Sequence, residues 1–144
     1  MLAFNHTLAG SIIAVVTPPP LVPFIALGSH FILDMTPHSG DSERRYPYTR
    51  LFIVQLIIDG MLCVAALTLA IWLFPDRWFI VGVGAFFGVL PDFLWPLWHH
   101  GPKWLDKFLD WAEWIQWGER PYGWIFDAFY GLIFVFSLFI LSVN

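Results

Sequence analysis

Three residues of metal-ligand type recur at every fourth position in the stretch SHFILDMTPHSGD, residues 29–41. They are His30, Asp34 and His38, and the residues around them are mostly apolar. Positions four apart lie on one face of an α-helix, so this spacing predicts a stripe about 12 Å long. A straight helix cannot bring all three side chains to one ion, but a pair can hold one ion, or two ions can share Asp34. Imidazole and carboxylate together are ligands typical of zinc, iron or manganese.

Other ionisable residues also fall inside or beside apolar runs, where a charged side chain is costly and therefore indicates function. Asp59 and Asp127 lie within such runs, and Asp92 lies near the end of another. Asp59 or Asp92 would complete a metal's ligand set or act as general base. The alternative is an ordinary structural role, such as hydrogen bonding between helices or, for Asp92, a helix cap. Asp127 has no assigned role at this stage.

A further histidine, His6, opens the first apolar run beside Asn5. We predict that it joins the stripe as a ligand, although it could equally be a structural residue at the start of a helix. The predicted metal ligands are therefore His6, His30, Asp34 and His38. The roles of His99 and His100 stay open, because a solvated histidine is ordinary in a loop before Gly-Pro.

The composition places these residues in a membrane protein. Of 144 residues, 58% are apolar and 12% are charged, whereas a soluble domain is about half apolar and about a quarter charged. The net charge of −4 and the absence of a basic run argue against nucleic acid as a partner. Cys63 is the only cysteine, which excludes an intrachain disulfide and a thiolate metal site.

The first two apolar runs predict short helices at about 3–16 and 21–37, separated by the proline-rich TPPP. Each run is about 21 Å long as a helix, which is short for a hydrocarbon core about 30 Å thick. We therefore predict a helical hairpin that dips into the bilayer with both ends on one side. One long kinked span is the alternative.

The rest of the chain predicts three transmembrane helices and one amphipathic helix in the interface plane. The spans are expected at about 51–74, 77–97 and 122–142, and the interfacial helix at about 103–117. Gly84 and Gly88 have the small-xxx-small spacing typical of close span packing. The prediction is an all-α, polytopic helical bundle, with residues 1–144 forming a single integral membrane domain.

Lysine and arginine concentrate in two connections, 39–50 and 98–121, while the turn at 75–78 has a single arginine. Positively charged loops face the cytoplasm, so both connections are predicted to be cytoplasmic. All five histidines and the intramembrane carboxylates would then lie in the cytoplasmic half of the bilayer.

These motifs resemble a known family. NHTLAG, then SHFILDMTPH, then LPD before a histidine-bearing segment look like the YdjM-type family of small bacterial membrane proteins, described as membrane-bound metal-dependent hydrolases. HFILDMTPH is also similar to the ligand stretch of zinc-dependent phospholipase C and P1-type nucleases. The chain departs from the YdjM pattern where PDFLW and WHHGP stand in place of its acidic and later histidine motifs.

The resemblance implies a metal-dependent hydrolase of the bacterial inner membrane, acting on phosphoester bonds in or near lipid. The residues that match are His6, His30, Asp34, His38 and Asp92. The expected cofactor is a divalent metal ion, with zinc placed ahead of iron and manganese, and the expected partner is membrane lipid. A homo-oligomer is left open. The competing interpretations are a small transporter or proton-relay component, and a non-catalytic protein stabilised by metal.

Overall fold

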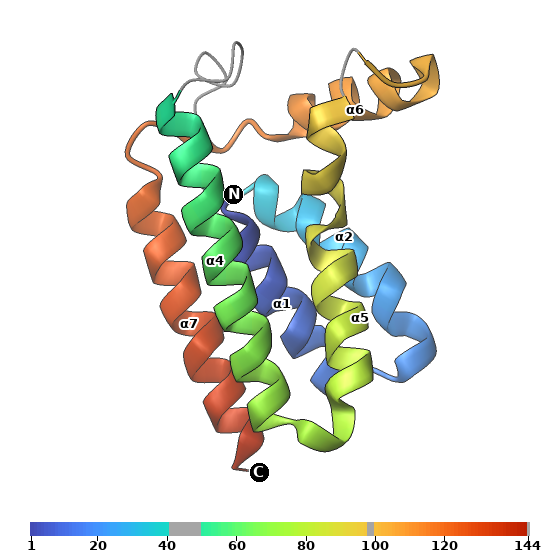
Figure 1. Cartoon of the computed structure of the whole chain (residues 1–144), viewed down its shortest axis with the longest axis vertical. Helices are drawn as coiled ribbons and strands as arrows, with labels where there is room; N and C mark the ends of the chain where they lie inside the picture. The colour runs from blue at the N-terminus through green and yellow to red at the C-terminus, as the bar shows by residue number, and fades with distance from the viewer. Residues whose placement is uncertain (41–49, 98–99, 144) are drawn as a thin grey trace.

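The computed structural model describes residues 1–40, 50–97 and 100–143. It is a helical bundle in which two short helices, α1 (Ala3–Val16) and α2 (Val22–Asp34), precede the long helix α4 (Arg50–Leu73) (Figure 1). α5 (Trp78–Val89) continues as the 3₁₀ helix η3 (Leu90–Leu97), and α6 (Lys103–Ile115) and α7 (Trp124–Ser142) follow. The prediction of a mostly helical chain is confirmed.

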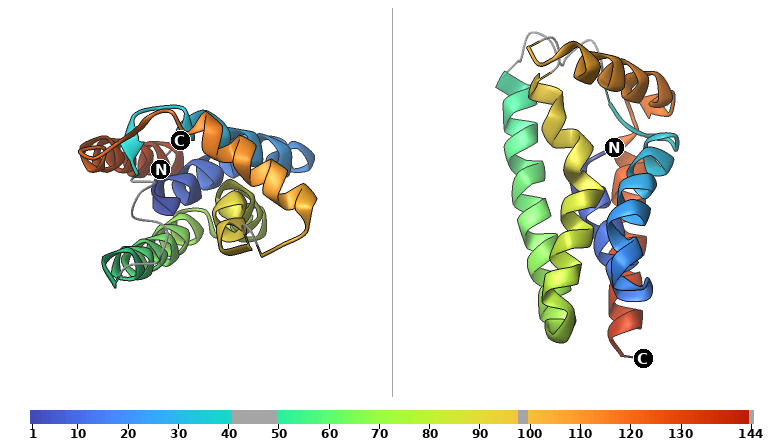
Figure 2. Two further views of the ribbon diagram at one scale, coloured as in Figure 1. Left: turned by 90° about the horizontal axis from the view of Figure 1, so that it is seen from above. Right: turned by 90° about the vertical axis from the view of Figure 1, so that its right-hand side faces the viewer.

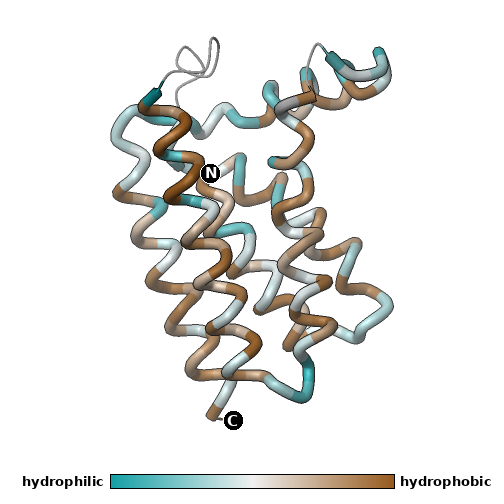
Figure 3. Tube along the Cα trace, viewed as in Figure 1, coloured by the Kyte–Doolittle hydropathy of each residue, from teal (hydrophilic) through white to brown (hydrophobic). Residues whose placement is uncertain are grey.

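Three helices are long and apolar enough to cross a membrane: Arg50–Leu73, Pro75–Trp95 and Trp124–Ser142. They lie close to the predicted spans. Hydrophilic colours mark the short turn η2 (Pro75–Arg77) at one end of the bundle and parts of α6 at the other (Figure 3). Buried polar residues such as Asp59 and Asp127 lie within the long helices themselves.

The two short helices form a hairpin whose open end lies at the α6 end of the bundle (Figure 1). α1 ends at Val16, where the amide of Thr17 still donates to the carbonyl of Ile13 at 2.9 Å. The prolines that follow have no N–H to continue the helix, and the 3₁₀ turn η1 (Pro19–Leu21) reverses the chain into α2.

The predicted end of the second short helix, at residue 37, is wrong by three residues. α2 ends at Asp34, and the amide of Thr36 bonds to the carbonyl of Leu33 in a tight turn. Pro37 disfavours helical geometry in the residue before it. His38 then begins a two-residue strand, β1 (His38–Ser39), which pairs in parallel with β2 (Glu119–Arg120). The predicted helical stripe therefore includes His30 and Asp34 but not His38.

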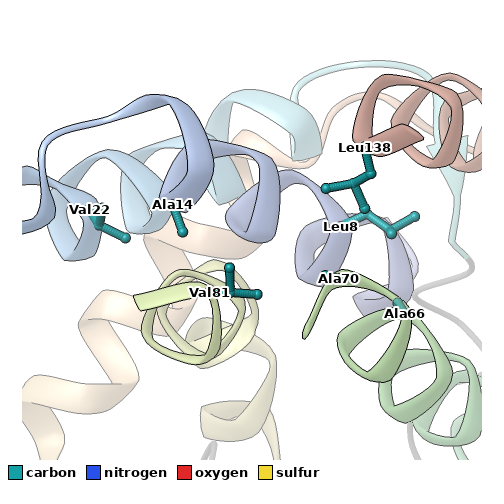
Figure 4. Packing of buried hydrophobic residues seen from close by; sticks show 7 residues of the cluster. All are labelled: Leu8, Ala14, Val22, Ala66, Ala70, Val81 and Leu138. Carbon is teal, nitrogen blue, oxygen red and sulfur yellow. The ribbon is translucent and has the colours of Figure 1, made fainter. Parts of the chain in front are cut away.

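α1 lies at the centre and packs against α2, α4, α5 and α7 (Figure 2). Small residues bring its backbone close to α5. A Cβ on Gly10 would overlap the carbonyl of Gly84, and one on Gly88 would overlap the carbonyl of His6. The packing role predicted for Gly84 and Gly88 is thus seen in the fold. A buried apolar cluster joins the helices and is formed by Leu8, Ala14, Val22, Ala66, Ala70, Val81 and Leu138 (Figure 4).

α6 lies across the end of the bundle (Figure 2). One side of it buries Leu105, Leu109, Ala112 and Ile115, which agrees with the predicted amphipathic character. Phe108 and Trp111 contact Phe31 of α2, with ring centroids 6.1 and 5.0 Å away. The side chain of Trp104 is 70% exposed. α6 thus covers the open end of the hairpin and exposes the side chain of Trp104 on its outer side.

Candidate metal centre

His6, His30 and Asp34 converge at the open end of the hairpin. His30 and Asp34 are one turn apart on α2, so their side chains share a face, and the antiparallel α1 brings His6 to them. Nε2 of His6 lies 3.1 Å from Oδ1 of Asp34, and Nε2 of His30 lies 3.2 Å from Oδ2. The two imidazole rings stack, with centroids 3.9 Å apart. Asp34 is therefore held between two histidines from different helices.

A backbone carbonyl orients His30. Nδ1 of His30 lies 2.8 Å from the carbonyl oxygen of Gly88, and a carbonyl can only accept a hydrogen bond. Nδ1 must therefore carry the hydrogen, which leaves Nε2 directed at Asp34. Metal-bound histidines commonly show this arrangement, in which one ring nitrogen donates to a carbonyl and the other is a ligand. The close approach of α1 to Gly88 is what allows the three helices to meet here.

The three side chains are removed from solvent. His6, His30 and Asp34 are 0%, 1% and 1% exposed. The α-amino group of Met1 also lies 2.8 Å from Oδ1 of Asp34. Within the described residues, Nδ1 of His6 has no hydrogen-bond partner. A buried carboxylate is costly unless positive charge lies beside it, and the α-amino group of Met1 supplies that charge here; a metal ion at Asp34 would take the place of this ammonium.

The geometry fits one metal ion. One ligand atom from each of His6, His30 and Asp34 lies within 4.8 Å of the others. Zinc ligands lie about 2 Å from the ion, so two ligand atoms of one ion are at most about 4 Å apart. The separations of 3.1 Å from His6 to Oδ1 and 3.2 Å from His30 to Oδ2 of Asp34 satisfy that limit, while the two histidine nitrogens are held only to the wider bound of 4.8 Å. Of the four predicted ligands, the structure brings His6, His30 and Asp34 together, whereas His38 is not part of this group.

Asp92 lies at the edge of the cluster. Its Oδ1 is 3.9 Å from Nε2 of His30, and its side chain is 24% exposed. Its other oxygen, Oδ2, is buried and has no hydrogen-bond partner in the part of the chain that the structure describes. Asp92 is placed by η3, where α5 tightens into 3₁₀ geometry around Pro91. A carboxylate with a free oxygen beside the ligands can take a proton or complete a ligand set.

His38 lies outside the three-residue cluster. Its Nδ1 donates to the carbonyl of Thr36 at 2.7 Å, and its Nε2 is 4.0 Å from Oε1 of Glu119. Burial lowers the pKa of His38 from 6.5 to about 4, against the smaller raising effects of Thr36 and of the carboxylates Asp34 and Asp127. The ring is therefore neutral at pH 7, and its Nε2 lone pair faces Glu119.

The side chain of Asp59, on α4, contacts the start of α1. Its Oδ2 accepts from the amide of Ala3 at 2.8 Å, and its Oδ1 accepts from the amide of Phe4 at 3.0 Å. The first amides of a helix have no hydrogen-bond acceptor within the helix, so the Asp59 carboxylate serves as the acceptor for two of them. Both oxygens of Asp59 are engaged with backbone, and the described contacts do not bring it to His30 or Asp34.

Asp127 connects three parts of the chain. Oδ1 accepts from the side chain of Asn5 at 3.2 Å, and Oδ2 accepts from the amide of Ser39 at 2.8 Å and from its hydroxyl. The residue is 2% exposed. Asp127 thus joins α7 to α1 and to β1, which fixes the turn that carries His38.

The sequence did not single out Glu119, which the strand pairing places beside His38. No local pattern marks Glu119, which lies in a tryptophan-rich connection without a motif. Only the pairing of two segments far apart in the sequence brings it to His38. His100 is exposed and apart from the cluster, while His99 and the loop arginines Arg44 and Arg45 lie outside the described residues. Comparison of the chain with family models, with curated proteins and with solved structures found no match to any of them.

Proposed function

We propose that this chain is a membrane-embedded, metal-dependent hydrolase with a divalent ion held by His6, His30 and Asp34. The observation that carries the proposal is the convergence of three buried ligand atoms from two helices within 4.8 Å of one another. The hydrogen bond from His30 to Gly88 supports it, because it directs Nε2 towards the same point. Zinc is the expected ion, since two imidazoles and a carboxylate are a common set of zinc ligands.

A divalent ion of this kind supplies Lewis acidity and lowers the pKa of a coordinated water to near 7. The protein's part is to hold the ligands and to move a proton. Asp92 is the candidate base, because its Oδ2 has no partner among the described residues and its side chain remains partly exposed. His38 and Glu119 form a separate pair, with Nε2 and Oε1 4.0 Å apart, and we assign them no part in the reaction.

The proposed substrate is a lipid phosphoester. We propose that the three long apolar helices cross the membrane with the α6 end at the cytoplasmic face. The cluster then lies at the depth where lipid headgroups meet acyl chains. The exposed tryptophans of α6, Trp104 at 70% and Trp114 at 74%, are of the type that gathers in that interface.

The metal content of the purified protein in detergent tests the proposal. We expect about one zinc, iron or manganese ion per chain in the wild type, and its loss in His30→Gln and Asp34→Asn. Two matched controls, His100→Gln and Asp76→Asn, alter an exposed histidine and a carboxylate in the turn at the opposite end, so they should keep the metal. Circular dichroism of each variant separates ligand loss from unfolding.

Wild-type protein that binds no metal even when the metal is supplied would overturn the proposal. The polar cluster would then be a hydrogen-bond or proton network between helices. If metal is present, Asp92→Asn separates catalysis from metal binding. It should keep the ion and lose hydrolysis of phospholipid phosphoesters, whereas a protein that uses metal only for stability shows no turnover in either form.

A further inference from the structure

A groove runs along the surface of the bundle beside the metal cluster. It has a volume of about 260 Å³ and lies over α1, between α2 and α7, lined by Ala9, Ile13, Ser29, Ile32, Leu33 and Phe134. Both α2 and α7 pack on α1, so α1 forms the floor of the groove.

The groove offers nothing polar to a ligand. Ser29 is its one hydroxyl-bearing side chain, and its Oγ donates to the carbonyl of Ala26 at 2.7 Å within the same helix. Such a bond leaves the aliphatic part of the serine facing outward. An occupant must therefore be a hydrocarbon, because a polar group would lose its hydrogen bonds there without replacement.

One end of the groove adjoins the proposed metal ligands. Ser29 and Leu33 directly precede His30 and Asp34 in α2. On α1 the lining runs from Ala9, about one helical turn beyond His6, to Ile13, a length of about 6 Å at 1.5 Å per residue. The groove thus starts about one turn from the polar cluster and runs towards the tip of the hairpin.

The groove opens onto a surface that the spans present to lipid. Ile32 at its rim is 66% exposed, and on α7 Leu132 and Phe136 are 71% and 66% exposed. Its size also limits the occupant. The volume equals about nine water-sized volumes of about 30 Å³, which suits a segment of one hydrocarbon chain. A helix from a second copy is about 10–12 Å across with its side chains, and it would cover the groove rather than enter so small a volume.

We propose that this groove binds one acyl chain of the membrane lipid whose headgroup the metal centre cleaves, so that the chain positions the phosphoester at the cluster. The assignment of that lipid as substrate rests on the function proposed above. The hydrophobic effect does not hold the chain in place, since the surrounding bilayer is equally apolar. The acyl chain would instead be held by close van der Waals packing in the groove, as helices in membranes are held together, and by its covalent link to the headgroup at the metal centre.

Photolabelling of the full chain in vesicles tests this inference. The vesicles contain phosphatidylethanolamine and phosphatidylglycerol, with a small fraction of phosphatidylglycerol that carries a diazirine in one acyl chain. We expect the label to concentrate on the half-buried Ile13 and Leu33 and on Ile32, although Val64 of α4 at 67% is as exposed as Ile32 at 66% and more exposed than the other two. Moving the diazirine towards the chain's methyl end should shift the label from Leu33 to Ile13.

Two matched variants give the control. Ser29→Leu places a larger side chain in the groove and should reduce its labelling to the level of Val64. Gly82→Leu does the same to a second apolar groove of about 400 Å³ between α4 and α5, where a Cβ meets nothing within 4 Å. It should leave the first groove's labelling unchanged. Metal content is measured in all three proteins.

The outcomes separate the two proposals. Label spread evenly over exposed apolar positions, with bound metal, would refute the groove and leave the hydrolase intact. Labelling of the groove in protein without metal would refute the hydrolase and leave a lipid-binding groove. Crosslinks between copies of a Ser29→Cys variant would assign the groove to a second chain and overturn the inference.

Discussion

The role of Asp59 can be tested directly by truncating its side chain. Asp59→Ala removes the acceptor of two helix-terminal amides, those of Ala3 and Phe4 at 2.8 and 3.0 Å. A buried donor left without a partner costs about 1–3 kcal/mol, and an anion at a helix N-terminus contributes about 0.3–1 kcal/mol. Two such amides and the lost anion together give about 2–7 kcal/mol. Because both hydrogen bonds are only part-buried, the expected loss in the free energy of unfolding lies in the lower half, about 2–4 kcal/mol. Asp59→Asn keeps one acceptor oxygen and should lose about half of that.

The assay is reversible unfolding in mixed micelles, read beside metal content, with Asp76→Asn as the reference for an exposed carboxylate. A helix cap predicts that Asp59→Asn is less stable but still binds about one metal ion per chain. The reasoning fails if Asp59→Ala costs less than about 1 kcal/mol. It also fails if Asp59→Asn loses the metal while its stability is unchanged, since Asp59 would then serve the metal centre as the sequence suggested.

Three further perturbations have defined outcomes. Gly88→Ala should lower the free energy of unfolding by about 1–3 kcal/mol, because its Cβ overpacks against the carbonyl of His6. Gly82→Ala should be neutral or stabilising, since its Cβ meets nothing within 4 Å. Equal stability of the two variants would contradict the close packing at Gly88. Chelation should lower the thermal midpoint, because metal at about a hundred times its Kd contributes about 2.7 kcal/mol to the native state, and an unchanged midpoint would contradict a metal in the fold. For His38, the pKa is lowered from 6.5 to about 4 in the fold. The contribution of the neutral ring to the free energy of unfolding is therefore fully present above pH 6.5, and it is lost as the pH falls to about 4. Metal-free wild type should therefore lose about 3 kcal/mol more than His38→Gln over that window, and parallel curves would show that His38 is not buried neutral.

Much of the fold could be predicted because it follows from local properties. Long apolar runs predict the three long helices, and consecutive prolines predict the turn of the hairpin. The four-residue spacing of His30 and Asp34 predicts their shared face, because α2 is regular through both. The same rule failed for His38, since helical periodicity applies only as far as the helix extends, and the chain before Pro37 leaves it.

The rest of the site depends on contacts between distant segments. The apolar run of α1 predicts a helix, but the crossing at Gly10 and Gly84 decides that His6 reaches Asp34. Likewise, an aspartate inside a span could be a base or a cap, and only its position opposite the start of α1 distinguishes the two for Asp59. The position of Glu119 beside His38 requires the pairing of β1 with β2, which no local pattern predicts.

The central place of α1 has a consequence for how the chain is assembled during synthesis. α1 comes before α2, α4, α5 and α7 in the sequence, yet it packs against all four. Its polar residues Asn5, His6 and Ser11 are buried, and the partners of Asn5 lie on α7, the last helix of the bundle. The ribosome therefore releases the first helix long before its final environment exists. The metal ligands His6, His30 and Asp34 lie on α1 and α2, so they can meet early, whereas Asn5 gains its hydrogen-bond partners only after α7 has been made.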